Sequence, residues 1–262
     1  MSVTGYTLRQ GRMPLLLSLP HDGTALPPGV SARLTDSARA LPDTDWFVSR
    51  LYAFASELGA SVLTAHWSRY VVDLNRPPDG ASLYPGRFET GICPLRTFAG
   101  EPIYRDDAVP AVAEIAARVE TYWQPYHAAL AAELERLRAA HDHVLLWDGH
   151  SIRGELPQLF TGALPDLNLG TADAASCGSG AALALAHALG AQSAYTFAIN
   201  GRFKGGYITR HYGRPEQGIH AVQLELAQRT YLDEAAAHWD AARANALQGL
   251  LRRLLETGLA AL

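Results

Sequence analysis

Short apolar runs alternate along this chain with stretches of helical periodicity, and this alternation limits the possible folds more than any other feature. Runs this short suit strands that are buried on both faces, and their alternation with helices is typical of an α/β layer architecture. Strands are expected at Leu15–Leu19, Ser61–Ala65, 70–74, 143–147, 193–199, 206–209 and 221–226.

Helical periodicity predicts longer helices at 46–58, 109–140, 180–189 and 233–255. Gly59 is expected to end the first of these helices, and Pro125 to break or kink the second. The segment 76–107 is rich in proline and glycine, so a long irregular loop is expected there, ordered by its aromatic residues. No repeat or linker divides the chain, and residues 1–262 are therefore expected to form one α/β domain.

The composition excludes several classes of protein. The 262 residues carry a formal net charge of −4, so no basic excess is available for a phosphate backbone and nucleic acid is not expected as a partner. The apolar run Leu15–Leu19 is too short for a signal peptide, and no stretch reaches the roughly 20 apolar residues that span a bilayer. A soluble, cytoplasmic protein without a membrane partner is expected.

Several familiar motifs are absent. Neither of the two cysteines, Cys93 and Cys177, belongs to a CxxC pair, which excludes a zinc knuckle or a redox pair. Two free thiols are expected in a cytoplasmic chain. No GxSxG sequence is present, so a serine hydrolase of that type is excluded, and the glycine-rich loop 200–213 lacks the order of a P-loop.

Two histidines, His21 and His150, are candidate metal ligands because each follows a predicted apolar strand. In open α/β sheets, ligands bind at the carboxyl ends of the strands. Each histidine has an acid and a glycine beside it, in His-Asp-Gly at 21–23 and Asp-Gly-His at 148–150. Glycine permits a tight turn and an acid can orient an imidazole. A hydrogen-bonded histidine without a metal is the alternative for each.

A third ligand is expected from a carboxylate, because a catalytic zinc usually has three protein ligands and one open position. Asp43 and Asp45 lie ahead of the helix predicted at 46–58 and are both candidates. An aspartate in this place also serves as a helix N-cap, so both interpretations remain open.

Glu225 and a group of cations complete the candidates. In the predicted strand 221–226 Glu225 shares a face with Gln223, and it is either a solvent-facing residue or a general base. Arg76 precedes two prolines and is either a bidentate carboxylate receptor or the partner of a nearby acid. The loop 200–213 suits a small anionic substrate or a plain hairpin, and its cations are Arg202, Lys204 and Arg210.

In their order along the chain these motifs resemble the N-formylglutamate amidohydrolases. The resemblance extends over about 14–234 and rests on the motifs at 20–23, 43–47, 72–77, 148–151, 200–213 and 223–226. It implies a mixed central β-sheet with helices on both faces, similar to the zinc exopeptidases and aspartoacylases. It also implies their order of functional residues, which here reads His21, Asp45, Asn75-Arg76, His150 and Glu225.

The resemblance implies metal-dependent hydrolysis of N-formyl-L-glutamate to formate and L-glutamate, as the last step of a histidine degradation route. A divalent metal, zinc by analogy with the peptidases, would be held by His21, Asp45 and His150. Zinc exopeptidases carry their first two ligands as HxxE, whereas position 24 here is threonine. Asp22 and Asp43 therefore remain alternatives to Asp45.

The resemblance also implies roles for the remaining candidates. Glu225 would be the general base. Asn75 and Arg76 would hold one carboxylate of the substrate, and the other would be held by Arg202, Lys204 or Arg210. Two rival functions share these motifs: an aminoacylase or aspartoacylase-like deacylase with a larger acyl pocket, and a catalytically silent binding protein for acidic amino acids. A bound metal and hydrolysis would exclude the silent protein.

Overall fold

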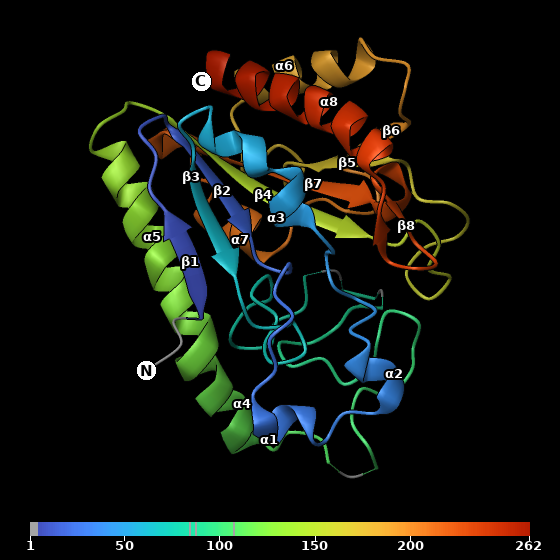
Figure 1. The fold of residues 1–262 in the computed structure, drawn as a ribbon. Helices are drawn as coiled ribbons and strands as arrows, with labels where there is room; N and C mark the ends of the chain where they lie inside the picture. The colour runs from blue at the N-terminus through green and yellow to red at the C-terminus, as the bar shows by residue number, and fades with distance from the viewer. Residues whose placement is uncertain (1–4, 84, 87, 107) are drawn as a thin grey trace.

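The computed structural model describes residues 5–83, 85, 86, 88–106 and 108–262, and its centre is a seven-stranded sheet. The strand order is β1-β3-β2-β4-β7-β5-β6 (Figure 1). β2, β3, β4 and β7 run parallel, whereas β1 is antiparallel to β3 and β5 is antiparallel to β7. The bounds are β1 Tyr6–Arg9, β2 Leu15–Leu19, β3 Ser61–Ala65, β4 Val144–Ile152, β5 Leu167–Gly170, β6 Phe197–Ile199 and β7 Ile219–Ala227.

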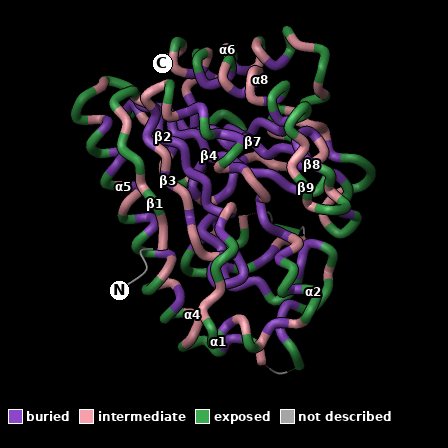
Figure 2. The backbone as a smooth tube through the Cα atoms, viewed as in Figure 1, coloured by how far each residue is buried: buried purple, intermediate pink, exposed green. Residues whose placement is uncertain are grey.

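Helices cover both faces of this sheet, and each face has its own hydrophobic core. Alternate residues of β2 point into the two cores: Leu15, Leu17 and Leu19 into one, and Leu16 into the other. All of β2 is therefore buried (Figure 2), which explains its continuous apolar run. The predicted α/β class and mixed sheet are confirmed. The first core includes α3 (Val48–Leu51), α6 (Ser179–Gly190) and α8 (Ala241–Ala260), and the second includes α5 (Gln124–Arg138) and α7 (Tyr207–Tyr212).

Five of the predicted strands are found. Leu15–Leu19 and Ser61–Ala65 match β2 and β3, 221–226 lies within β7, and β6 forms only the last three residues of 193–199. The strand predicted at 143–147 is longer than expected, because β4 stays paired with β7 as far as Ile152. His150 consequently lies inside a strand and not after one.

The strand predicted at 70–74 is wrong, although its residues are buried. The chain turns here: the N–H of Val71 donates to Ser68 O, and the Asp73 carboxylate accepts the N–H of Asn75. Such side-chain bonds to the backbone replace the hydrogen bonds of a sheet. The apolar residues therefore pack into the cores without joining the sheet.

The strand predicted at 206–209 is also wrong, because α7 begins there. The N–H groups of Tyr207 and Ile208 donate to the backbone oxygen and the side-chain Oδ1 of Asn75, at 3.3 and 2.8 Å. These bonds satisfy amide groups that the first turn of a helix leaves open. Local sequence carries no sign of them, since Asn75 and Ile208 are 133 residues apart.

The long helix at 109–140 is found with an interruption. It consists of α4 (Val112–Arg118), a π-helical turn η2 (Val119–Trp123) and α5. The wide turn lies immediately before Pro125, as the predicted break requires.

The remaining helices agree in part. α6 matches 180–189, whereas 46–58 holds two short helices, α3 and the 3₁₀ turn η1 (Ala53–Ser56), with Gly59 following at φ +72°. The C-terminal helix begins later than predicted. The hairpin of β8 (Leu232–Asp233) and β9 (His238–Trp239) precedes it, and the Asp240 side chain caps α8 by accepting two backbone N–H groups.

The segment 76–107 contains no helix or strand among its described residues, as predicted. It lies with α1 (Pro28–Ser31) and α2 (Asp36–Arg39) beyond the carboxyl end of β3 (Figure 1). Small apolar clusters hold it, with Tyr104 against Leu34 and Phe98 against Ile152. The segment thus covers the end of the sheet at which the candidate residues lie.

Two further expectations concern the cysteines and membrane-spanning helices. Cys93 and Cys177 are buried free thiols, as predicted. No helix in the described part of the chain has the length and apolar character needed to cross a membrane.

Candidate active site

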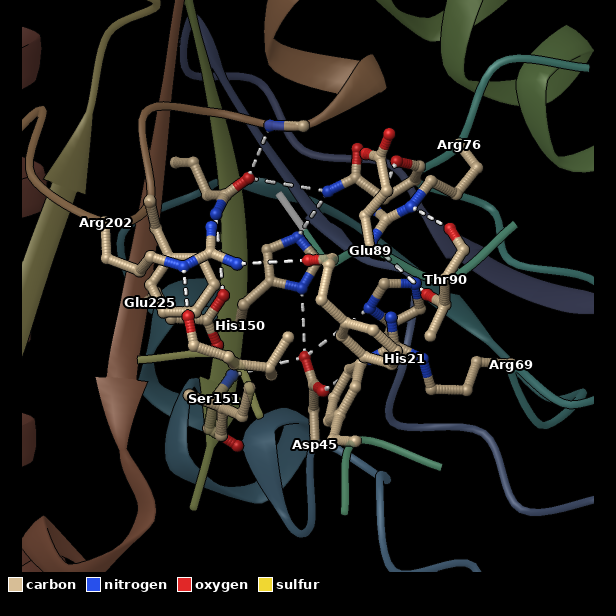
Figure 3. A pocket seen from close by; sticks show the side chains of 18 residues that line it. His21, Asp45, Arg69, Arg76, Glu89, Thr90, His150, Ser151, Arg202 and Glu225 are labelled. Carbon is tan, nitrogen blue, oxygen red and sulfur yellow. Dashed lines mark hydrogen bonds and ion pairs between the residues drawn. The ribbon is translucent and has the colours of Figure 1, made fainter. Parts of the chain in front are cut away.

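His21, Asp45 and His150 meet at the carboxyl end of the central strands (Figure 3). His21 follows β2 and His150 lies in the adjacent parallel strand β4, which brings their ring centroids to 4.9 Å. Asp45 Oδ2 is 2.9 Å from His150 Nδ1 and 3.8 Å from His21 Nδ1. All three side chains are buried, and the potential donor atoms lie within 4.8 Å of one another.

A further carboxylate holds the outer nitrogen of each histidine. His21 Nε2 is 2.7 Å from Asp73 Oδ1, and His150 Nε2 is 3.1 Å from Asp148 Oδ2. A neutral imidazole that donates from Nε2 to its carboxylate would leave the lone pair of Nδ1 on the side of Asp45. Carboxylates orient metal-binding histidines in this way.

Two basic side chains, Arg69 and His21, contact the Asp73 carboxylate. Arg69 places one guanidinium nitrogen 2.6 Å from Asp73 Oδ2 and another 3.9 Å from Asp45 Oδ1. Burial opposes the ionisation of Asp73, but Arg69 and His21 outweigh it and hold the pKa of Asp73 well below its ordinary value. Burial, with Arg69, lowers the pKa of His21, which favours the neutral imidazole that a metal requires.

The surroundings of His150 favour a positive charge. Burial opposes its protonation, but Asp148 and Asp45 outweigh burial and raise the pKa of His150 well above its ordinary value. The two carboxylates beside this imidazole therefore favour a positive charge at this position.

Glu225 lies beside this cluster because β7 pairs with β4, where the register partner of Glu225 is His150. Gln223 Nε2 donates to Glu225 Oε2 at 3.5 Å, and Gln223 is itself held by the N–H of Gly206 at 2.8 Å. Burial raises the pKa of Glu225 to about 8, with Asp45 adding to the shift and His150 opposing it. A carboxyl group with such a pKa can accept and return a proton near neutral pH.

Only Asp45 of the three carboxylates left open by the sequence joins the histidines among the described residues. Asp43 accepts the Tyr70 hydroxyl at 2.8 Å and the N–H of Phe98 at 3.0 Å. Asp22 is half-buried and bonds to Ser49, and burial raises its pKa.

These groups open into a cavity in which Arg76 and Arg202 lie on opposite sides of the cluster (Figure 3). Arg76 Nε donates to Thr90 O at 2.8 Å, and Arg202 Nε donates to Leu159 O at 2.8 Å. Each guanidinium is thus fixed by a backbone carbonyl while it remains at the cavity wall. Apolar side chains complete the lining, namely Phe88, Phe98, Ile152, Leu159 and Phe203.

The other predicted substrate residues are placed differently. Lys204 pairs with Asp173 at 2.9 Å and Arg210 Nε donates to Gly205 O, and neither residue lines this cavity. Asn75 does line it, but protein groups occupy both ends of its amide. Its Oδ1 accepts from Ile208, and its Nδ2 donates to Asp148 Oδ2 at 3.0 Å and lies 2.9 Å from His150 Nε2.

Arg69 and Asp73 were not among the candidates from the sequence, whereas Asp148 orients His150 as the acid beside that histidine was expected to do. All three are charged and buried, with exposed fractions of 6%, 0% and 0%. Asp73 and Asp148 each stand within or directly after an apolar run, and a charge in such a place requires a partner because an unpaired buried charge is costly. Arg69 Nε is buried and has no hydrogen-bond partner among the described residues, and the Arg69 side chain lines the cavity.

Comparisons with known proteins show the family to which the chain belongs. The family model of N-formylglutamate amidohydrolase matches residues 13–232. An N-formylglutamate deformylase of Pseudomonas aeruginosa is 52% identical, covering 97% of this chain and 96% of its own length. One from Pseudomonas putida is 48% identical and covers 97% and 95%.

Solved structures give the same result for the fold. The crystal structure of an N-formylglutamate amidohydrolase from Ralstonia eutropha JMP134 has a TM-score of 0.82 at 25% identity, over 98% of this chain and 97% of that chain. A gene product of Agrobacterium tumefaciens has a TM-score of 0.73 at 19% identity, over 97% and 96%, and shares the fold.

Proposed function

We propose that this chain, which belongs to the N-formylglutamate amidohydrolase family, hydrolyses N-formyl-L-glutamate to formate and L-glutamate. The observation that carries the proposal is the buried cluster of His21, Asp45 and His150 beside Glu225, at a cavity with two arginines in its wall. We further propose a single catalytic domain at 1–262 and a place as the last step of a histidine degradation route. The two free thiols support a reducing cytoplasm.

A divalent metal belongs to this proposal, because the donor set fits one. His21 and His150 each turn Nδ1 toward the Asp45 carboxylate, and Asp73 and Asp148 hold the opposite nitrogens. Two imidazoles and one carboxylate form a common ligand set of catalytic zinc, and zinc is therefore the metal we propose. When bound, it would polarise the formyl oxygen and increase the acidity of water.

Glu225 acts in this proposal first as a general base and then as a general acid. Its carboxylate takes a proton from the attacking water and returns it to the glutamate nitrogen as the C–N bond breaks. A pKa raised by burial to about 8 lets Glu225 keep the proton between these steps. Gln223 donates to this carboxylate and is itself held by the N–H of Gly206.

Arg69 is well placed to stabilise the negative charge that develops on the formyl oxygen. It lines the cavity, stays charged, and has a buried Nε without a protein partner among the described residues. Fixed donors directed at developing charge make a large contribution to catalysis. Asp73 fixes the guanidinium at 2.6 Å and thus prepares it before the substrate binds.

Arg76 and Arg202 bind the two carboxylates of the substrate. N-formylglutamate is a dianion at neutral pH, because its amine is capped and both carboxyl groups are ionised. Two arginines at opposite sides of one cavity match two carboxylates at opposite ends of a short ligand. Asn75 contributes indirectly, because its amide contacts Asp148 and His150.

Formate release from three substrates tests the function. N-formylglutamate should be hydrolysed, whereas N-formylglutamine should show a strongly reduced kcat/KM, because one arginine loses its carboxylate. Preference for N-acetylglutamate, measured as acetate release, would instead support an aminoacylase. Absence of turnover with every substrate, together with measurable glutamate binding, would support the silent binding protein. Glu225→Gln serves as the inactive control in each assay.

Lys204→Met and Arg202→Met form a matched pair from the same loop. Only Arg202 lines the cavity, so only Arg202→Met should raise KM for N-formylglutamate. A comparable rise in KM for Lys204→Met would place the second anchor on Lys204.

A further inference from the structure

The backbone on either side of Asn75 belongs to no helix or strand, so its carbonyl oxygens need partners from elsewhere. Two side chains of the α4–α5 helix supply them. His127 Nε2 lies 2.9 Å from Leu74 O, and Trp123 Nε1 donates to Arg76 O at 3.1 Å. The two donors are four residues apart, so they project from the same face of the helix onto consecutive parts of this segment.

The rings of Trp123 and His127 are stacked, with centroids 3.7 Å apart, and both side chains are buried. Leu74 O can only accept, so Nε2 carries the proton of the neutral imidazole, and Nδ1 is left as the acceptor that faces Tyr212 OH at 2.9 Å. Burial lowers the pKa of His127 to about 3, in agreement with a neutral ring. Both hydrogen bonds thus agree with the tautomer that donates to Leu74.

The π-helical turn η2 ends at Trp123. The N–H of Gln124 bonds to Val119 O, five residues back, and Pro125 has no N–H to continue an α-helical ladder. A wide turn adds a residue to the helix and rotates the part before the turn relative to the part after it; such turns are frequent at functional sites. The turn sets the direction in which Trp123 meets the 74–76 segment.

We propose that Trp123 and His127 form a clamp on the backbone of 74–76 that positions Arg76 to bind the substrate. They are positioning residues, because neither side chain lines the cavity and both act through the backbone of this segment. The clamp rests on the proposed function, since its effect passes through Arg76 as a carboxylate anchor. α7 packs against Trp123 and His127 through Tyr207 and also donates to Asn75 from Tyr207 and Ile208, so the segment is bonded to both helices.

Trp123→Phe removes the indole N–H and keeps an aromatic ring for the stack. The carbonyl of Arg76 then loses its buried donor, and the backbone from which the Arg76 side chain extends is no longer held in place. We expect KM for N-formylglutamate to rise about tenfold while kcat falls less than threefold, because the change weakens binding in the ground state and the transition state alike.

A double-mutant cycle with Arg76→Met separates positioning from general destabilisation. If Trp123 acts through Arg76, Trp123→Phe should raise KM no further in the Arg76→Met background. The clamp would be overturned if Trp123→Phe raised KM by the same factor in both backgrounds. A KM for Trp123→Phe within twofold of the unmodified enzyme would also overturn it.

Trp147→Phe is the matched control, because Trp147 Nε1 also donates a buried hydrogen bond, at 2.9 Å to Tyr52 OH, on the other core. It should lower the melting temperature as much as Trp123→Phe does and leave KM unchanged. A KM rise in this control equal to that of Trp123→Phe would also overturn the clamp. If Trp123→Phe fails to fold, His127→Leu and His127→Gln replace it: Gln keeps a donor and should restore a KM that Leu raises.

Hydrogen exchange of the Trp123 indole proton, followed by NMR, tests the clamp without turnover. Slow exchange is expected, and exchange at the rate of an exposed indole would contradict it. An enzyme that releases no formate would defeat the proposed function alone, whereas an active enzyme with fast indole exchange would defeat only the clamp.

Discussion

Acid should destabilise the fold through His127, and the size of the effect follows from its burial. Burial lowers the pKa of this imidazole to about 3, whereas the unfolded chain has a value of about 6.5. The folded state must keep the ring neutral to donate to Leu74 O, while the unfolded state takes up a proton as the pH falls. A lowered pKa in the folded state means that this stability is fully present above about pH 6.5 and is lost below it.

The linkage relation gives the expected magnitude. Between pH 7 and pH 5 the unfolded ring becomes almost fully protonated and the folded ring remains neutral, so His127 alone removes about 2 kcal/mol from the free energy of unfolding.

Urea denaturation of the unmodified protein and of His127→Gln at a series of pH values measures this contribution. A chelator is added to both, so that metal loss does not contribute. The amide of Gln does not titrate, and the variant should lose about 2 kcal/mol less than the unmodified protein between pH 7 and pH 5. Parallel curves for the two proteins would show that His127 takes up no more protons in the unfolded state than in the folded state, contrary to this prediction.

The remaining predictions concern catalysis and metal binding. Glu225→Gln should keep its metal and its melting temperature while kcat falls by roughly 10²–10⁴, as measured by formate release; a kcat within tenfold of normal would remove the general-base role. Asp148→Asn should weaken metal affinity roughly 10–100-fold in a competition titration, because the outer nitrogen of His150 loses its carboxylate, and an unchanged affinity would contradict the tautomer assigned to His150. Arg69→Met should lower kcat more than it raises KM, and the opposite split would make Arg69 a substrate anchor.

The sequence was sufficient to predict those parts of the fold that are governed by local pattern. Leu15–Leu19 is buried on both faces, so its apolar run could be recognised as a strand without further information. The same rule failed at 70–74, where burial comes from packing and the carboxylate of Asp73 ends the extended chain. It failed again at 206–209, where a distant residue, Asn75, starts α7.

The candidate site was predictable to the extent that its residues follow apolar strands. His21, His150 and Glu225 could be found because they stand at or near the ends of β2, β4 and β7, whereas Asp45 was one of several acids ahead of a helix. Asp148, two residues before His150, could be recognised as an orienting acid, whereas Asp73 was not found because its partner is distant in sequence. His21 and Asp73 are 52 residues apart, and only the fold shows that they meet.

Reconstitution of the metal-free protein tests whether hydrolysis depends on a metal held by His21, Asp45 and His150. The protein is stripped with a chelator and titrated with Zn²⁺, and bound metal and formate release from N-formylglutamate are measured on the same samples, with His21→Ala and His150→Ala alongside. We expect activity to rise in proportion to bound metal up to one equivalent, and neither variant to bind metal or recover activity. Full formate release by the metal-free protein, or a full equivalent of metal in either variant, would contradict this expectation.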